Sequence, residues 1–270
     1  GLGLARQLGL LPQQGSRADA GMLRAFNARS GAARRLAGGA AEPVADGVWR
    51  VRGGVPREMN VYLIEDDGGG VTVFDAGVRS MATAITAAGA LLGGINRVVL
   101  GHGHVDHRGA AARLGAPVYC HPDARSDVEG DAGRRYMDLS RLAPHARVIY
   151  PPLLRMWDGG PVAIAGTVED GEDVSGFRPV LVPGHAPGQI ALFRERDGVA
   201  LTSDAFYTLD IQTGLHGRPR VAHPAFNQDT EQARASIRKL AELAPSAAWP
   251  GHAEPLRGDV AAQLQRAAAS

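Results

Sequence analysis

The sequence contains only one cysteine, Cys120, in 270 residues, so no disulfide can form within the chain. A fold held together by disulfides is therefore excluded, and the composition fits a reducing compartment. No apolar run approaches the roughly 18 residues that a membrane-spanning helix requires. The first residues do not have the pattern of a secretory leader. We therefore expect a cytoplasmic protein that has no membrane partner.

The chain also lacks a large excess of either charge. Its net charge is +1, and its hydrophobic share of 44% and charged share of 21% are those of an ordinary globular protein. The charge is unevenly spread, because residues 1–41 carry six arginines and one acidic residue. That segment has a net charge of +5, so the remainder carries −4. A broad cationic surface on the main body is not indicated, and no nucleic-acid partner is expected.

Residues 1–41 form a basic N-terminal arm that is rich in alanine, glycine and arginine. Leucines at positions 4, 8 and 11 have near-helical spacing, and Pro12 and Gly15 interrupt the pattern. We interpret the segment as a partly helical arm packed on the main body, which comprises residues 42–270. The alternative is a lid or a dimerisation arm, and the latter would make the protein a homodimer.

From residue 42 onward, short β-rich runs alternate with turns and helical segments. The expected strands cover residues 48–51, 60–64, 71–75, 97–100, 117–120, 162–164, 179–182, 190–193, 199–202 and 247–249. The expected helices cover residues 80–92, 108–114, 230–244 and 258–269. The pattern divides into two β-rich halves, each flanked by helices, which indicates an α/β fold.

An insert at about residues 123–160 separates the two halves. It carries a set of large apolar side chains, namely Tyr136, Met137, Leu139, Leu142, Leu153, Leu154, Met156 and Trp157. One interpretation is a helical segment that hides its own apolar face. The other is a hydrophobic wall or cap over a functional site. The sequence leaves both open.

The strongest chemical signal is an HxHxDH motif that follows the apolar run ending at Leu100. Imidazole and carboxylate groups are the ligands that zinc and similar divalent metals prefer. Three further candidates follow other predicted strands, and loops at strand ends commonly converge on one site. The predicted metal ligands are His102, His104, Asp106, His107, His185, Asp204 and His252.

The order HxHxDH…H…D…H, from about Val44 to the C-terminus, resembles the metallo-β-lactamase-fold superfamily of metallohydrolases. In motif it is most similar to N-acyl homoserine lactone lactonases and glyoxalase II-like hydrolases. The resemblance implies a four-layered αβ/βα sandwich with a binuclear metal centre between its two sheets. It assigns His102, His104 and His185 to one metal, and Asp106, His107 and His252 to the other. Asp204 and a hydroxide would bridge two zinc ions, although iron, manganese or cobalt suit the same ligands.

The resemblance also implies roles for three individual side chains. Asp106 could accept a proton from the nucleophile or pass it to the leaving group, and Asp75 would orient a ligand from beneath the motif. Tyr207 stands three residues after Asp204, where the lactonases have a tyrosine that hydrogen-bonds the lactone. The alternative for Tyr207 is a packed aromatic whose hydroxyl is bonded to the backbone. The remaining histidines are expected to be structural or at the surface, namely His121, His145, His216 and His223.

The identities of the ligands narrow the activity that the resemblance implies. Asp204 stands where the β-lactamases usually lack an aspartate, and His104 where the diiron flavoproteins have glutamate. Only 18 residues follow His252, so the helical glutathione-binding domain of glyoxalase II is not expected. We therefore expect a hydrolase that opens a lactone or cleaves a similar carboxylic ester of a small molecule. The alternatives are a glyoxalase II-like thioester hydrolase and, with less support, a β-lactamase or a non-catalytic metal-binding protein.

Overall fold

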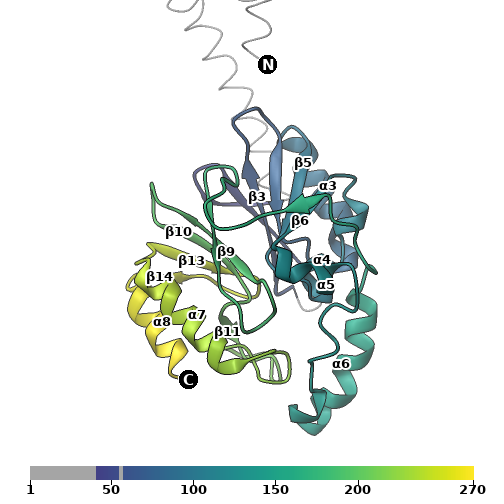
Figure 1. Ribbon diagram of the computed structural model, residues 1–270, viewed down its shortest axis with the longest axis vertical. Coiled ribbons are helices and arrows are strands. Elements are labelled where there is room, and N and C mark those ends of the chain that lie inside the picture. The colour runs from purple at the N-terminus through teal and green to yellow at the C-terminus, as the bar shows by residue number, and fades with distance from the viewer. Residues whose placement is uncertain (1–40, 55–56) are drawn as a thin grey trace, which may run out of the picture.

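The computed structural model describes residues 41–54 and 57–270 (Figure 1). The arm predicted for residues 1–41 therefore lies outside the described residues, apart from Ala41. Within the described ranges, no helix combines the length and the apolar character that crossing a membrane requires.

The first half of the chain forms a mixed sheet of seven strands in the order β1-β2-β3-β4-β5-β6-β7. Neighbours are antiparallel from β1 to β4 and parallel from β4 to β7. The strands are β1 (Glu42–Ala45), β2 (Val48–Gly53), β3 (Met59–Glu65), β4 (Val71–Phe74), β5 (Ile95–Leu100), β6 (Val118–Cys120) and β7 (Gly166–Thr167).

The second half forms a sheet of five strands in the order β14-β13-β10-β9-β8, in which only β10 and β13 are parallel. Its strands are β8 (Arg178–Leu181), β9 (Ile190–Arg194), β10 (Val199–Ser203), β13 (Ala247–Pro250) and β14 (Leu256–Arg257). A separate hairpin pairs β11 (Tyr207–Leu209) with β12 (His216–Arg220).

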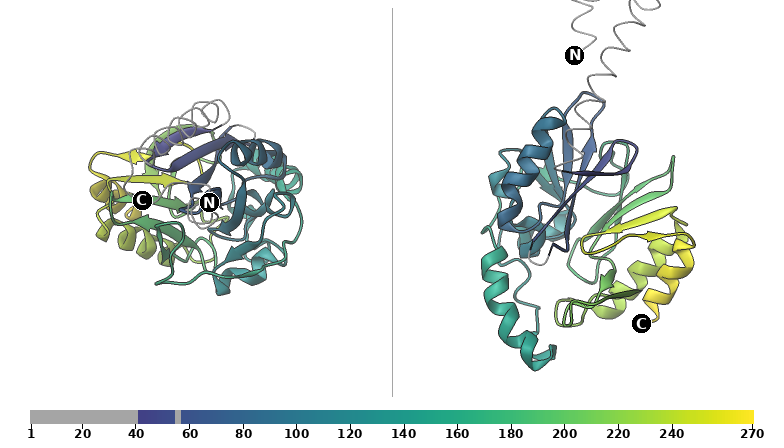
Figure 2. Two further views of the ribbon diagram at one scale, coloured as in Figure 1. Left: turned by 90° about the horizontal axis from the view of Figure 1, so that it is seen from above. Right: turned by 180° about the vertical axis from the view of Figure 1, so that it is seen from behind.

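Helices lie on the outer faces of both sheets and in the insert between the two halves (Figures 1 and 2). The α-helices are α3 (Ala82–Leu91), α4 (Val105–Arg108), α5 (Arg125–Val128), α6 (Pro144–Trp157), α7 (Thr230–Glu242) and α8 (Val260–Ala268). The 3-10 turns are η1 (Arg79–Met81), η2 (Ala111–Arg113), η3 (Pro122–Ala124) and η4 (Leu139–Arg141). The side chain of Asp229 caps α7 by accepting hydrogen bonds from the backbone N–H groups of Glu231 and Gln232.

The two sheets pack face to face, and helices cover their outer faces (Figure 2). Because side chains alternate along a strand, β3 directs Tyr62 toward the second sheet, while Leu63 joins the core under α3. In the second sheet, Leu201 packs into the core between the sheets, and Ala200 packs against α7 and α8. The structure is thus the predicted four-layered αβ/βα sandwich.

Some of the predicted elements were wrong. Residues 162–164 form no strand, and β6 pairs instead with the two-residue strand β7. The helix predicted for residues 108–114 is replaced by α4 and η2. Helix α4 begins within the HxHxDH motif, because the carbonyl of His104 accepts hydrogen bonds from the N–H groups of His107 and Arg108. Asp106 and His107 consequently lie on a helical turn and not in an extended loop.

Candidate metal centre

All seven predicted ligands lie at one edge of the sandwich, where strands from both sheets end. The chain supplies them from five places. His102 and His104 follow β5, and Asp106 and His107 lie on α4; the others follow β8 (His185), β10 (Asp204) and β13 (His252). Asp106 is partly exposed. The other six residues are buried, and none of them is more than 8% exposed.

The described residues form three groups of potential metal ligands, and two of these groups contain predicted ligands only. In the first of these groups, the ligand atoms of His102, His104 and His185 lie within 4.8 Å of one another. The ligand atoms of the second group are equally close. That second group comprises Asp106, His107 and His252.

Asp204 lies between the two groups. Its Oδ1 is 3.1 Å from Nε2 of His107, and its Oδ2 is 3.3 Å from Nε2 of His252. The same Oδ2 is 3.5 Å from Nε2 of His185, which belongs to the other group. One carboxylate therefore faces both groups, as a bridging ligand must.

Each of four histidines is held by one ring nitrogen. Nδ1 of His102 is 3.1 Å from Oγ of Ser203, and Nδ1 of His185 is 2.8 Å from Oδ1 of Asn227. The other two contacts join Nδ1 of His107 to Oδ2 of Asp75, at 2.9 Å, and Nε2 of His104 to the hydroxyl of Tyr136, at 2.8 Å. Such supports fix ring orientation and tautomer in metal sites.

The ring nitrogens that do not contact these supports show whether the site suits a metal ion. Nε2 of His102 and Nε2 of His185 are buried and have no hydrogen-bond partner among the described residues. Buried polar atoms rarely stay unpaired, since the loss of solvation is costly. Two lone pairs directed at a common space, beside carboxylates, fit a divalent cation.

Asp75 contacts the backbone at the start of the motif and the side chain of His107. Its Oδ1 accepts a hydrogen bond of 2.8 Å from the N–H of Gly101, and its Oδ2 accepts one of 2.8 Å from Oγ of Ser203. Asp75 could also form a ligand group with His102 and His107. Because both of its oxygens already accept hydrogen bonds, we treat it as a support for His107.

The backbone beneath the site is strained. Asp75 and Ser203 have φ values of 60° and 46°, in the left-handed region that non-glycine residues seldom adopt. Glycines permit other close approaches, since a Cβ on Gly251 would lie 2.4 Å from Oδ1 of Asp204. Strain of this kind is typical of functional sites, where the surrounding structure enforces it.

The protonation equilibria differ between the two groups. Burial, together with the neighbouring imidazoles, holds the pKa of His102 well below its usual value. Burial alone would raise the pKa of Asp106, but His252 and His107 lower it to about 2. Burial would lower the pKa of His252, but Asp204 and Asp106 raise it to about 9. The site thus combines ionised carboxylates with imidazoles, and a metal would displace the proton that the carboxylates hold on His252.

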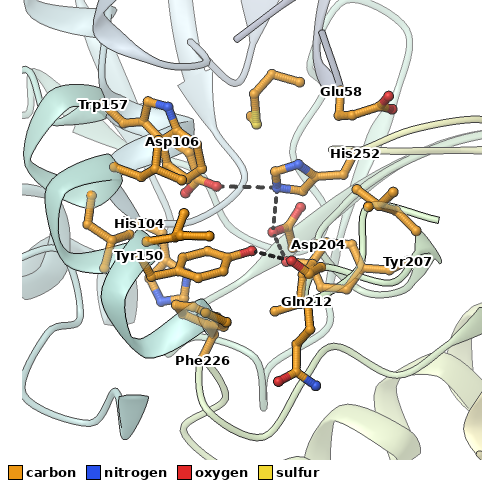
Figure 3. A pocket seen from close by; sticks show the side chains of 18 of the residues that line it. Glu58, His104, Asp106, Tyr150, Trp157, Asp204, Tyr207, Gln212, Phe226 and His252 are labelled. Carbon is orange, nitrogen blue, oxygen red and sulfur yellow. Dashed lines mark hydrogen bonds and ion pairs between the residues drawn. The ribbon is translucent and has the colours of Figure 1, made fainter. Parts of the chain in front are cut away.

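A mainly apolar cavity of about 300 Å³ opens onto the ligands (Figure 3). Its lining includes ligands of both groups together with Tyr207 and Phe226. Apolar side chains of α6 form one wall, namely Ala146, Ile149, Leu153, Leu154 and Trp157. Tyr150 from the same helix also lines the cavity, and its hydroxyl donates to the carbonyl of Ile211 across it. No lysine or arginine belongs to the described residues of the lining.

Tyr207 lies in the cavity wall, 6% exposed, and its hydroxyl donates to Oδ2 of Asp204. The hydroxyl is therefore bonded to a predicted ligand and not to the backbone. His145, which we expected to be structural or at the surface, is exposed and also lines the cavity. His121 accepts a hydrogen bond from the N–H of Asp123, and His216 lies 3.2 Å from Oε1 of Glu58.

Three supports of the histidines were missed by the sequence reasoning. Ser203 precedes a predicted ligand, but serine in that position has no distinctive pattern. Tyr136 was grouped with the apolar residues of the insert, and Asn227 lies 42 positions from the histidine it contacts. None of the three belongs to a recognisable motif, so only the folded arrangement reveals them.

Comparison with known proteins agrees with this architecture. The sequence profile described as "Metallo-beta-lactamase superfamily" matches residues 54–252. Among curated proteins, the chain is 29% identical over 232 residues to the "Probable metallo-hydrolase YflN" of Bacillus subtilis (strain 168), covering 74% of this chain and 82% of that protein. It is 23% identical to the "Probable metallo-hydrolase YqjP" of the same organism, covering 74% and 68%.

Solved structures with the same fold include the metallo-beta-lactamase family protein TTHA1429 from Thermus thermophilus. It has a TM-score of 0.62 and 24% identity, and the match covers 84% of this chain and 80% of that one. An archaeal superfamily protein, ST1585 from Sulfolobus tokodaii, has a TM-score of 0.55 and 19% identity, with coverage of 83% and 86%. Because the profile spans most of the chain and the fold agrees, this chain belongs to the metallo-β-lactamase superfamily.

Proposed function

We propose that the chain is a metal-dependent hydrolase that opens a lactone or cleaves a similar uncharged carboxylic ester. One observation carries the proposal. Two groups of potential ligands share Asp204 and face a mainly apolar cavity. A hydrolase needs this combination, because water must be activated where a substrate carbonyl can reach it.

The residues that would hold the metals are those of the two groups. His102, His104 and His185 would bind one ion, Asp106, His107 and His252 the other, and Asp204 both. We propose two zinc ions, and iron, manganese or cobalt would suit the same donors. When bound, such ions lower the pKa of water toward neutrality and polarise the attacked carbonyl.

Two side chains are proposed to act on the reacting atoms. Asp106 is partly exposed and lines the cavity, and its pKa of about 2 keeps it ionised. So low a pKa makes the carboxylate a weak base, and the proposed role in passing a proton to the leaving oxygen rests on its place in the cavity lining. Burial and the carboxylate of Asp204 raise the pKa of Tyr207 well above its usual value, so its hydroxyl remains a hydrogen-bond donor. In the structure this proton is donated to Asp204, so the hydroxyl stabilises the carbonyl or the leaving oxygen only by turning from Asp204 to the substrate.

The cavity favours an uncharged substrate with an apolar portion. A buried carboxylate or phosphate is costly unless a cationic partner pairs with it, and the described lining provides no arginine or lysine. The charged side chains in it are instead Glu58, Asp106 and Asp204, together with histidines. An acyl chain could pack against the apolar side chains of α6.

A glyoxalase II-like thioesterase is the second candidate, because the same ligands would serve thioester hydrolysis. Glutathione itself carries carboxylates, and the described lining offers them no lysine or arginine. The apolar wall would better suit a thioester with an uncharged, apolar acyl group.

The test is turnover of a substrate panel by zinc-loaded and chelator-treated protein. The panel comprises a short-chain and a long-chain acyl homoserine lactone, S-lactoylglutathione, a cephalosporin and an aryl ester. We expect metal-dependent turnover that is fastest on a lactone. A preference for S-lactoylglutathione would reject the lactone proposal, and absence of turnover of every substrate by fully loaded protein would reject the hydrolase proposal.

Asp106→Ala provides the matched test of the mechanism. We expect turnover to fall by about 10²-fold or more, since general acid–base groups contribute roughly 10²–10⁴-fold. Asp67→Ala is the control, because Asp67 is exposed in the turn between β3 and β4. Equal turnover by the two variants would contradict the role of Asp106.

A further inference from the structure

Tyr136 connects the insert to the candidate metal centre. Its hydroxyl lies 2.8 Å from Nε2 of His104, and it donates a hydrogen bond of 2.8 Å to Oδ2 of Asp127. Asp127 is fully buried on α5, and its Oδ1 forms an ion pair of 2.5 Å with the guanidinium of Arg135. The four residues therefore form a relay in the order Arg135, Asp127, Tyr136 and His104.

The direction of the hydrogen bonds in this relay follows from chemistry. A carboxylate paired with a guanidinium is ionised and can only accept, so the single proton of the tyrosine hydroxyl is used on Asp127. The hydroxyl oxygen can then only accept from His104. Nε2 of His104 must consequently carry the hydrogen, which leaves Nδ1 as the ring nitrogen with a free lone pair.

We propose that Tyr136 is a positioning residue for His104, which it holds in the Nε2–H tautomer with Nδ1 free to bind a metal. The inference rests on the proposed metal site but concerns a residue outside the ligand set. Metal-binding histidines are commonly fixed by a hydrogen bond from the other ring nitrogen, and loss of that partner typically weakens metal affinity.

The packing around the relay is close at Tyr136 and at Asp127. A Cβ on Gly133, whose φ is +76°, would lie 2.3 Å from the hydroxyl oxygen of Tyr136 and 2.9 Å from Cδ2 of His104. A Cβ on Gly103 would lie 2.4 Å from Cβ of Asp127. Glycines therefore bring the backbone against the relay, which restricts the rotation of Tyr136.

The residue that supports His104 comes from a different part of the chain than the residues that support the other histidines. Ser203 ends β10 and Asp75 follows β4, and they support His102 and His107. Asn227, which supports His185, lies in the segment before α7. Tyr136 instead belongs to the insert at residues 123–160, which also supplies α6 to the cavity wall. The insert that lines the cavity thus also fixes the orientation of one proposed metal ligand, His104.

The experiment compares Tyr136→Phe with the unchanged chain and with Tyr119→Phe. Tyr119 is the matched control, because it is partly buried on β6, in a strand that carries none of the predicted ligands. Zinc affinity is measured by competition with a chromophoric chelator, and bound zinc is counted by elemental analysis. We expect Tyr136→Phe to weaken one zinc site by about 10- to 100-fold and Tyr119→Phe to weaken neither.

A second readout separates positioning from a general loss of structure. Nitrogen-15 NMR of the histidine rings in metal-free protein identifies which nitrogen carries the hydrogen. We expect the Nε2–H form of His104 in the unchanged chain and a mixture of tautomers in Tyr136→Phe. Unchanged zinc affinity with an unchanged tautomer would overturn the proposal. If Tyr136→Phe fails to fold, Asp127→Asn tests the same relay, because the weaker acceptor should also mix the tautomers.

The outcome is distinguishable from a failure of the proposed function. Zinc affinity and the tautomer of His104 are measured without any substrate, so they stand even if no lactone or ester is hydrolysed. A chain that binds no zinc would overturn both proposals.

Discussion

At the residue scale, the site depends on buried polar groups that support one another. Asp75 shows the principle, since one carboxylate receives hydrogen bonds from Gly101 and Ser203 and also faces His107. Removing one partner from such a network leaves buried groups unsatisfied, which costs about 1–3 kcal/mol for each group. The left-handed backbone of Asp75 and Ser203 is therefore tolerated where it completes the support of two ligands.

Tyr207→Phe tests the tyrosine that we propose to hydrogen-bond the substrate. The change removes the hydroxyl but keeps the ring, so the packing of this buried side chain should survive. We expect kcat for the preferred substrate to fall by about 10²-fold, as is typical when one hydrogen-bond donor to a developing oxyanion is lost. Steady-state kinetics and zinc content are measured on the same preparation.

Zinc content decides how that result is interpreted. The hydroxyl of Tyr207 also donates to Asp204, so a loss of bound zinc would indicate that it acts through the ligand. Unchanged kcat with unchanged zinc would contradict a catalytic role and leave Tyr207 as a packing residue.

The candidate ligands could be picked out from the sequence because their motif is compact and its spacing is specific. Four of the seven lie within six residues, and the others follow apolar runs that predict strand ends. Their supports could not, since a hydrogen bond between His104 and Tyr136 spans 32 positions and the one between Ser203 and Asp75 spans 128. Such pairs are created by the folded chain and leave no local pattern.

At the element scale, the sequence predicts strands well where burial is complete and poorly elsewhere. Strand β3 is buried over six of its seven residues, and the apolar run at residues 60–64 predicted it. Strand β12, with the sequence HGRPR, is largely exposed and lacks any apolar alternation, so no pattern predicted it. It forms because β11 supplies its hydrogen-bonding partner.

Helix α6 was expected only as an undefined helical insert. Pro151 and Pro152 lie within it, and proline usually interrupts a helix because it lacks an N–H group. Two hydrogen bonds connect the helix to the loop of the β11–β12 hairpin. The N–H of Ala143 donates to the side chain of Gln212, and the hydroxyl of Tyr150 donates to the carbonyl of Ile211. These contacts join the insert to the second half of the chain across the cavity.

Leu153→Trp tests whether α6 selects the substrate. Leu153 is partly buried in the cavity lining, so a larger side chain there should reduce the space for an acyl chain. We expect kcat/KM for a long-chain lactone to fall by about 10-fold or more, because displacing a few buried methylene groups costs about 0.8 kcal/mol each. Hydrolysis of a short-chain lactone should change less.

Val148→Trp is the control on the same helix. Val148 is 74% exposed and does not line the cavity, so this variant carries the same new side chain away from the site. Equal losses for the long and short chains in Leu153→Trp would indicate a general disturbance of α6 and contradict its role in selecting the substrate.

At the scale of the whole molecule, the candidate metal centre lies where the two halves meet. The first half supplies His102, His104, Asp106 and His107, and the second supplies the remaining ligands. The halves also share a core of apolar side chains between the sheets and a β-bridge between Met59 and His252. Ligands from both halves bound to the same ions would add directly to the cohesion of the fold, because binding to the folded state alone stabilises it.

Removing the metals should therefore loosen the entire sandwich, and the buried thiol of Cys120 provides the readout. Burial raises the pKa of this thiol from its ordinary value of 9.0 to about 12. At about pH 8 the folded protein thus holds an almost fully protonated and unreactive thiol, and unfolding restores a reactive thiolate fraction. We expect chelator-treated protein to react with a disulfide reagent faster than zinc-loaded protein and to unfold at a lower temperature. Excess zinc should reverse both changes; equal rates and equal melting temperatures would contradict a structural contribution of the metals.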